Sequence, residues 1–265
     1  MTRNFLTRRH IPFVLSFDSK VLAEQFTIIE KDALNEINWQ DLINSRWHHN
    51  SPSTQNWVEF LRTQDATGIE LVTARFNIVV KWALSEIVLT QGLEERAMCV
   101  MKYIHIAAHA RRTHNYATML QLTIALASID CSRLTKTWEL VPAAEKKTLA
   151  ELETLVTPIK NFHNLRQEME TVNSDEGCIP VVAMYIHDLT YNSQKPSQIA
   201  STREGMPLVN FERYRTTASI VKSLLRLIDA SAKYQLKPVD GAIERCLWMA
   251  SLSDEMIRAK SKELE

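Results

Sequence analysis

Two histidines four residues apart come nearest to a metal site in this sequence. His105 and His109 are separated by Ile-Ala-Ala. In a helix this spacing puts both imidazoles on one face, as in zinc-binding helices. The glutamate of the zinc protease motif is missing, however, and the sequence offers no identifiable third ligand. We therefore predict histidines packed at a helix surface, with no bound metal and no other cofactor.

Motifs for covalent catalysis are missing as well. The sequence contains no GxxxxGK[ST], GxGxxG or GxSxG pattern. It has five glycines among 265 residues, about 2% against a usual share of about 7%. Phosphate-binding loops and Rossmann turns depend on glycine, because they need backbone conformations that other residues adopt poorly. We expect no catalytic residue in the covalent sense, which leaves protein binding as the default function.

The composition narrows the class of protein further. Lys+Arg and Asp+Glu each number 31, so the chain lacks the basic surplus of nucleic-acid binders. No apolar run approaches the roughly 20 residues that span a bilayer, and the run 11–15 is too short for a signal peptide. We expect a cytoplasmic protein without direct membrane insertion. Its widely spaced cysteines are predicted to be free thiols: Cys99, Cys131, Cys178 and Cys246.

Apolar residues recur at helical spacing through most of the chain. The pattern predicts helices over residues 18–37, 71–89, 94–112, 116–126 and 143–155. The polar stretch 192–205 separates an apolar segment, 180–191, from a long helix over 208–234. Two helices joined by such a long polar connection would project from the body. The sequence therefore predicts an all-α fold, a single domain with a protruding helical hairpin.

Several short segments occur in one order along the chain: Glu24–Glu30, Arg75–Asn77 with Trp82 and Glu86-Ile87, Arg133–Trp138, Asn161–Arg166, Cys178–Pro180, Tyr185–Leu189 and Asn210-Phe211. Together they resemble the catalytic domain of guanine-nucleotide exchange factors for Ras-family small GTPases, the domain shared with son of sevenless. The resemblance covers residues 18–265 and leaves 1–17 as a flanking segment. The hairpin tip is similar to that of fungal polarity or mitotic-exit exchange factors. The family implies a bowl-like helical domain with its hairpin at about residues 180–234.

The resemblance also implies a partner and a mechanism. The partner is a Ras-family small GTPase, nucleotide-free or GDP-bound. Its second switch segment docks in an apolar groove, while the hairpin pries the first switch from nucleotide and magnesium. Aligned on the shared segments, the groove residues are Trp47, Thr73, Leu120, Phe162 and Val181. The hairpin wedge residues are His187, Thr190 and Gln194. For each groove residue, plain core packing is an equal alternative.

The hairpin tip departs from the family pattern. Residues 191–196 replace a segment that commonly holds an aromatic, acidic residues and a Gly-Asn-Pro turn. Gln194 lacks the charge that could compete for the magnesium site, and Lys195 adds a positive one. An active exchange factor is the leading hypothesis. The alternatives are a GTPase-binding scaffold or effector that has lost exchange, and an unrelated helical interaction domain.

The sequence shows no additional N-terminal helical module or membrane-targeting domain of the kind that accompanies the family. We therefore expect an excised or terminal domain of a longer parent chain, recruited to membrane or cortex by other regions.

Overall fold

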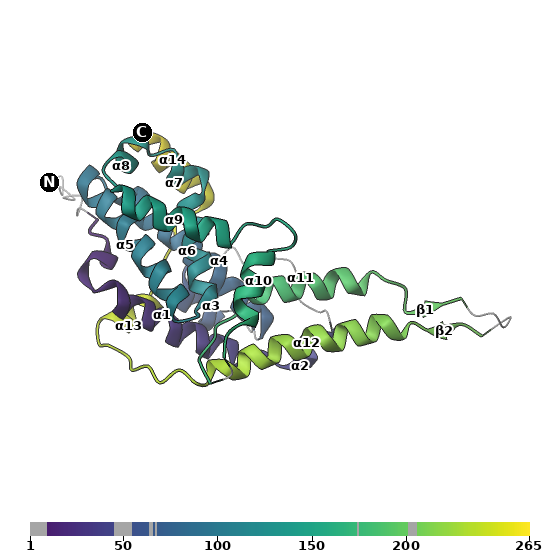
Figure 1. The fold of residues 1–265 in the computed structure, drawn as a ribbon. Coiled ribbons are helices and arrows are strands. Elements are labelled where there is room, and N and C mark those ends of the chain that lie inside the picture. The colour runs from purple at the N-terminus through teal and green to yellow at the C-terminus, as the bar shows by residue number, and fades with distance from the viewer. Residues whose placement is uncertain (1–9, 45–54, 64–65, 67, 174, 201–205) are drawn as a thin grey trace.

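The computed structural model describes residues 10–44, 55–63, 66, 68–173, 175–200 and 206–265. Helices form nearly all the regular structure of this part, which confirms the all-α prediction (Figure 1). The first half contains a 3-10 helix, η1 (Phe13–Ser16), followed by α1 (Ser19–Leu34), α2 (Trp39–Asn44), α3 (Trp57–Thr63), α4 (Ile69–Leu89), α5 (Leu93–Arg112) and α6 (Tyr116–Ala127). The second half contains α7 (Ile129–Ser132), α8 (Thr135–Glu139), α9 (Ala143–Leu155), α10 (His163–Glu170), α11 (Val182–Ser193), β1 (Gln198–Ile199), β2 (Leu208–Val209), α12 (Phe211–Ser231), α13 (Ala242–Leu247) and α14 (Asp254–Leu264).

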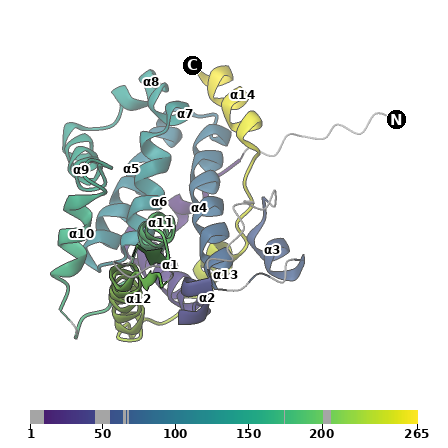
Figure 2. The same ribbon diagram turned by 90° about the vertical axis from the view of Figure 1, so that its right-hand side faces the viewer.

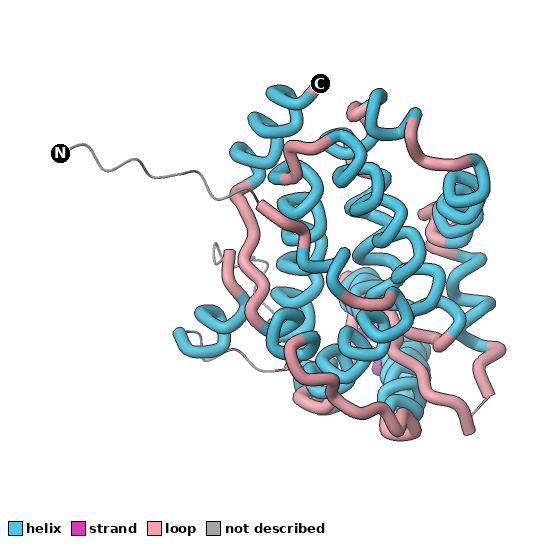
Figure 3. Tube along the Cα trace, turned by 90° about the vertical axis from the view of Figure 1, so that its left-hand side faces the viewer, coloured by secondary structure: helices cyan, strands magenta, loops and turns pink. Residues whose placement is uncertain are grey.

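Helix α4 packs against α5, α6 and α14 (Figure 2), within a body that is built of packed helices (Figure 3). Residues on nearly every side of α4 are buried, as expected for a helix without a polar face. The helix begins after Gly68, whose φ of 58° favours glycine. A Cβ atom there would also lie 2.6 Å from an Asp41 carboxylate oxygen, so this turn requires glycine.

One hydrophobic cluster extends from Phe13 to Ile257 and joins all the larger helices of the body. At its centre the ring of Trp82 packs against those of Phe13, Phe26 and Tyr103, with centroids 5.6, 6.0 and 5.8 Å away. These aromatic contacts connect η1, α1, α4 and α5.

A buried ion pair lies within this core. Arg75 of α4 is fully buried, and its Nε donates to Glu30 Oε1 of α1 at 3.2 Å. The guanidinium also donates to the Cys246 carbonyl at 3.2 Å, and Gln121 Nε2 donates to Glu30 at 3.3 Å. Burial raises the pKa of Glu30, although the Arg75 guanidinium opposes the shift. The pair joins α1, α4 and α6 to the segment around α13.

The segment before α13 closes over α1 through one side chain. The buried Gln25 amide donates to the Lys237 carbonyl at 3.3 Å, and its oxygen accepts from the Val239 N–H at 2.9 Å. Both polar ends of this amide are therefore satisfied by backbone that is distant in the sequence.

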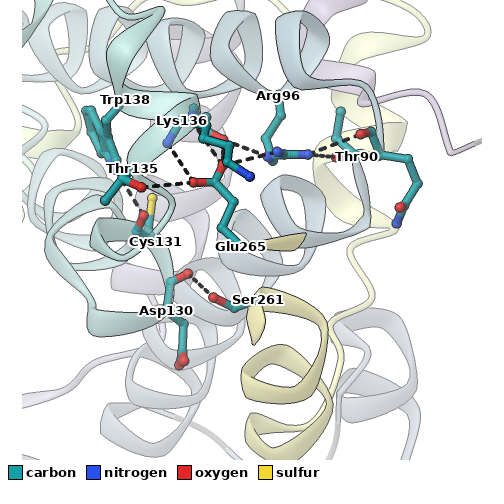
Figure 4. Close-up of polar contacts among 11 residues, drawn as sticks. Thr90, Arg96, Asp130, Cys131, Thr135, Lys136, Trp138, Ser261 and Glu265 are labelled. Atoms are coloured by element: carbon teal, nitrogen blue, oxygen red, sulfur yellow. Dashed lines mark hydrogen bonds and ion pairs between the residues drawn. The ribbon is translucent and has the colours of Figure 1, made fainter. Parts of the chain in front are cut away.

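Helix α14 is held against α7 and α8 in a similar way, by side chains that bind distant backbone groups (Figure 4). The Glu265 carboxylate accepts from the backbone N–H groups of Lys136 and Thr137 at 2.6 and 3.1 Å. It also lies 3.3 Å from Arg96 Nη2, and its side chain is only 4% exposed. Ser261 Oγ donates to the Asp130 carbonyl at 2.6 Å one turn earlier. A glutamate from a distant helix thus caps the first turn of α8.

Helices α11 and α12 lie side by side and project from the body, with β1 and β2 at their far end (Figure 1). The expected polar connection contains a short antiparallel ribbon, in which Ile199 pairs with Leu208. Consequently α12 begins at Phe211 and not at Leu208, and the Asn210 side chain caps it by accepting from the Arg213 N–H. The buried Asn192 amide of α11 donates to the Arg213 carbonyl at 2.8 Å, which joins the two arms.

All four cysteines are free thiols, as predicted, and the structure buries each of them. Burial raises the pKa of the Cys131 thiol to about 12, so this thiol stays protonated at neutral pH.

His105 and His109 lie at the surface of α5, where the structure gives each a non-metal neighbour. His105 Nε2 is 3.4 Å from a Glu145 carboxylate oxygen, and His109 Nδ1 is 2.7 Å from Arg112 Nη2. Burial lowers the pKa of His109, and the charge of Arg112 lowers it further. Among the described residues, no three histidine, cysteine or acidic side chains are grouped to hold a metal ion. Within the same residues, no helix combines the length and apolar character required to cross a membrane.

Candidate functional site

Four of the five predicted groove residues lie on elements that adjoin the root of the hairpin, namely α4, α6, the loop before α10 and the N-terminus of α11. Thr73 is exposed on α4, Leu120 is buried on α6, Phe162 is half-buried just before α10, and Val181 is buried at the N-cap of α11. We call these four residues the hairpin-root surface. Leu120 and Val181 expose only 5% and 2% of their surface, so they also pack in the core. The fifth residue, Trp47, lies outside the described residues.

Backbone hydrogen bonds fix the root of α11 against the turn between α5 and α6. The Ile179 N–H donates to the His114 carbonyl, and the Tyr116 N–H donates to the Ile179 carbonyl, both at 3.0 Å. Val181 follows two residues after Ile179, and Leu120 lies one turn after Tyr116 on α6. This pairing brings together the segments that carry Leu120 and Val181, two residues 61 positions apart in the sequence.

Asp188 of α11 holds the loop that carries Phe162. One carboxylate oxygen accepts from Asn161 Nδ2 at 2.9 Å, and the other lies 2.9 Å from Arg166 Nη1. Arg166 also donates to the Asn161 carbonyl at 2.8 Å and to the Met184 carbonyl at 3.3 Å. The loop before α10 is therefore fastened to α11 by one ion pair and several hydrogen bonds, which position Phe162.

The backbone of this loop is unusual. Lys160, Asn161 and Phe162 have φ angles of 51°, 57° and 57°, in the left-handed region that residues with a Cβ atom seldom adopt. Each such residue costs about 1–2 kcal/mol. Three in succession persist because the contacts of Asp188 and Arg166 hold the loop in place. Strain of this kind concentrates at functional sites, which makes this loop a candidate contact region.

The three predicted wedge residues form a line along α11. His187, Thr190 and Gln194 stand at positions i, i+3 and i+7, which share one helix face. His187 and Gln194 are exposed, whereas Thr190 is half-buried and donates to the Ile186 carbonyl at 2.9 Å. We call these three residues the wedge stripe. The exposed ring of Tyr191 lies beside it, one turn beyond His187.

Tyr185 and Arg166 pack together at the root of the hairpin. Burial raises the pKa of Tyr185 to about 12, although Arg166 opposes the shift, so the phenol is neutral at physiological pH. The Arg166 guanidinium lies over this ring at 5.7 Å from its centroid, and its charge is paired with Asp188.

Sequence reasoning missed several residues of this region. Asp188 and Arg166 were noticed only as parts of the resembling segments, because the bonds between them join distant positions. Ile124 of α6 and Ile129 of α7 are 41% and 75% exposed, although the sequence offers no reason to place them outside the core. Ile124 lies one turn beyond Leu120, so it extends the apolar character of the hairpin-root surface along α6.

Comparison with known proteins matches residues 21–215 to the RasGEF domain. This chain belongs to the RasGEF domain family. The matched range runs from α1 to the beginning of α12, so it includes the hairpin-root surface and the wedge stripe. The family resemblance seen in the sequence is thereby confirmed.

Fungal and animal proteins of this family resemble the chain. It is 36% identical over 255 residues to guanine nucleotide exchange factor LTE1 of Candida glabrata, covering 96% of this chain and 19% of that protein. The LTE1 protein of Saccharomyces cerevisiae is 31% identical over 253 residues, or 95% of this chain and 17% of that protein. Ras-specific guanine nucleotide-releasing factor 1 of the mouse is 26% identical over 234 residues, which cover 88% of this chain and 17% of that protein. The chain spans less than a fifth of the length of these RasGEF relatives.

Proposed function

We propose that this domain promotes release of GDP from a Ras-family small GTPase. The observation that carries the proposal is the RasGEF match over residues 21–215. It is supported by the names of relatives, which describe guanine nucleotide exchange or release. His187 and Gln194 are exposed on a projecting helix, and the half-buried Phe162 and the exposed Ile124 lie near its root, so this region offers a surface on which a protein partner can dock.

The proposed mechanism is non-covalent and follows from thermodynamic linkage. A protein that binds the nucleotide-free GTPase better than the GDP-bound form must weaken nucleotide binding by the same free energy. Each ~1.4 kcal/mol of preference weakens nucleotide affinity about tenfold. Burial of apolar surface supplies ~25 cal/mol per Å², less the cost of docking. No general base, metal or cofactor of this chain enters the mechanism.

The hairpin-root surface and the wedge stripe have different roles in this proposal. The hairpin-root surface binds the second switch of the GTPase, and the wedge stripe displaces the first switch. The Asp188–Arg166 pair acts indirectly, because it fixes the Phe162 loop and α11 to each other at 2.9 Å. A wedge needs this stiffness, since a flexible arm would yield before the partner opens.

A second candidate is a GTPase-binding module without exchange activity. It is favoured by the wedge itself, in which Gln194 is neutral and its neighbour Lys195 is positive. Both side chains are exposed at the end of α11, so the positive charge of Lys195 faces a docked partner. Binding through the apolar root tolerates this change better than competition for a magnesium site does.

Release of a fluorescent GDP analogue from a panel of Ras-like GTPases tests the proposal. An exchange factor accelerates release from at least one member in proportion to its concentration. A stable complex with a nucleotide-free GTPase but no acceleration would establish the binding module instead. If the domain neither accelerates release from any member of the panel nor forms a complex with one, both candidates are rejected.

Phe162→Ala is expected to weaken binding of the nucleotide-free GTPase about tenfold, since a half-buried aromatic at a docking surface contributes roughly 1–2 kcal/mol. The measurement is a calorimetric or fluorescence titration. Ile11→Ala is the matched control, because this apolar residue is 69% exposed and outside the hairpin-root surface. Equal affinities of the two variants would remove Phe162 from the contact region.

A further inference from the structure

The outer end of α11 is attached to α12 by hydrogen bonds that side chains of both arms donate. Asn192 of α11 is only 2% exposed, and its Nδ2 donates to the Arg213 carbonyl at 2.8 Å and to Thr217 Oγ1 at 2.9 Å. In return, Arg213 Nη2 donates to the Ser193 carbonyl at 3.0 Å. The last turn of α11 and the first two turns of α12, which lie side by side in Figure 1, are therefore joined in both directions.

The chain just beyond α11 is attached to the same end of α12. The Asn210 N–H donates to the Ser197 carbonyl at 2.9 Å, and Asn210 Nδ2 donates to the Pro196 carbonyl at 2.8 Å. Asn210 is also the N-cap of α12. Gln194 of the wedge stripe thus lies between two points, Asn192 and Pro196, that are both fixed to the beginning of α12.

The Asn192 side chain lies on the face of α11 opposite to the wedge stripe. It is two residues before Gln194, which corresponds to about 200° around the helix. It continues the buried stripe formed by Tyr185 and Leu189. A side chain buried on this face does not contact a docked partner, so any effect of Asn192 on that partner is indirect.

The Asn192 amide acts on α12 as a hydrogen-bond donor. A backbone carbonyl can only accept, so the Arg213 carbonyl determines which end of the amide faces it. The Asn192 Oδ1 atom is buried and has no hydrogen-bond partner among the described residues. The two donated bonds are therefore the polar contacts through which this side chain attaches α11 to α12.

We infer, on the basis of the proposed function, that Asn192 is a positioning residue for nucleotide exchange, which holds the outer end of the wedge stripe at a fixed place on α12. The wedge stripe then has two supports. The Asp188–Arg166 pair fixes its inner end to the root, and Asn192 fixes its outer end to the second arm. A displacement of about 1 Å in a group that acts on a bound partner can cost about a hundredfold in rate, so nucleotide exchange depends on both supports.

Nucleotide-release kinetics of Asn192→Asp test this role. The aspartate keeps the shape of the side chain, but it loses both donated bonds and places a carboxylate oxygen against the Arg213 carbonyl. We expect the maximal rate of GDP release at saturating domain to fall at least about tenfold. The affinity for the nucleotide-free GTPase should change by less than about threefold, because the hairpin-root surface is intact.

Asn38→Asp is the matched control. Asn38 is exposed on the body, and its Oδ1 accepts from the N–H groups of Gln40 and Asp41 at 2.8 and 3.0 Å, a role that a carboxylate keeps. Unfolding midpoints check that both variants fold. If Asn192→Asp releases GDP as fast as Asn38→Asp, or loses binding of the nucleotide-free GTPase as strongly as it loses rate, the inference is wrong.

A rescue variant separates positioning from a general loss of structure. Asn192→Leu combined with Thr217→Val replaces the hydrogen-bonded pair by an apolar pair, which should join the arms through packing. We expect this double variant to recover at least about half of the maximal rate of the parent. A double variant as slow as Asn192→Asp would contradict the inference, since attachment of the arms would then not be what nucleotide exchange requires.

Hydrogen–deuterium exchange tests the attachment without a GTPase. The backbone N–H groups of residues 190–197 should exchange with solvent at least about tenfold faster in Asn192→Asp than in the parent, while those of α5 stay unchanged. Equal rates in the two proteins would reject the attachment. If the parent accelerates GDP release from no GTPase of the panel, the proposed function fails, and the solvent-exchange rates alone then decide whether Asn192 positions the outer end of α11.

Discussion

Replacing Glu30 with alanine is expected to lower the free energy of unfolding by about 3–5 kcal/mol. The Glu30 carboxylate is buried at 3.2 Å from Arg75 Nε, and Arg75 is itself fully buried. Without Glu30 the guanidinium keeps its charge, because arginine does not deprotonate in proteins, and it stays fully buried without the carboxylate that pairs with it. Urea unfolding followed by circular dichroism measures the loss.

Two comparisons make this prediction specific. Glu24→Ala on the same helix removes a carboxylate 3.9 Å from Lys20 at the surface, and should change stability by less than about 0.5 kcal/mol. Glu30→Leu combined with Arg75→Met removes both buried charges, and should cost less than the sum of the two single changes. If the Glu30→Ala and Glu24→Ala variants had equal free energies of unfolding, the buried pair would not stabilise the fold.

Glu265→Gln is expected to lower the free energy of unfolding at pH 7 by about 1.5–3 kcal/mol, the usual contribution of hydrogen bonds to a charged group. The glutamine keeps the shape of the side chain but loses the charge that Arg96 and the first turn of α8 stabilise. Glu263→Gln is the matched control, because Glu263 is exposed and its carboxylate pairs with Lys260 on the same helix at 2.7 Å.

The same residue predicts a pH dependence. Burial raises the pKa of Glu265, but hydrogen bonds from Lys136, Thr137 and Arg96 lower it by more, so the pKa lies below its ordinary value. Glu265 therefore stabilises the fold above its unfolded pKa of about 4.3, and this contribution disappears as the pH falls through the folded value. The stability difference between the parent and Glu265→Gln should shrink from pH 7 to pH 3. A difference that stays constant over this range would contradict the assigned role.

Sequence patterns located the helices because local spacing determines them. Asp18, at the start of the predicted range 18–37, caps α1, since its side chain accepts from the Lys20 N–H at 2.8 Å. The ribbon at the hairpin tip was missed, because two-residue strands have no periodicity to detect. Arg75 and Glu30 could not be recognised as a buried pair either, since single charges in amphipathic patterns usually face water.

The candidate site was harder to predict than the fold. Leu120 and Val181 have the same residue types as their core neighbours, so only the family resemblance distinguished them. The hairpin-root surface depends on contacts between distant segments, such as Asp188 with Asn161, that no local pattern reports. The wedge stripe was easier, because His187, Thr190 and Gln194 lie on a single helix, whose geometry the sequence already determines.

The closure of the body over α1 has a consequence for biosynthesis. Gln25 leaves the ribosome 212 residues before Lys237, the carbonyl that its amide binds. Until that later stretch emerges, the Gln25 amide of the nascent chain lacks these backbone partners, and the side of α1 that the stretch covers stays exposed. The two arms of the hairpin are joined across only 21 residues, from Asn192 to Arg213, so they can pair soon after translation. We therefore expect nascent chains halted before residue 237 to depend on chaperones, with the projecting arm assembled ahead of the body that supports it.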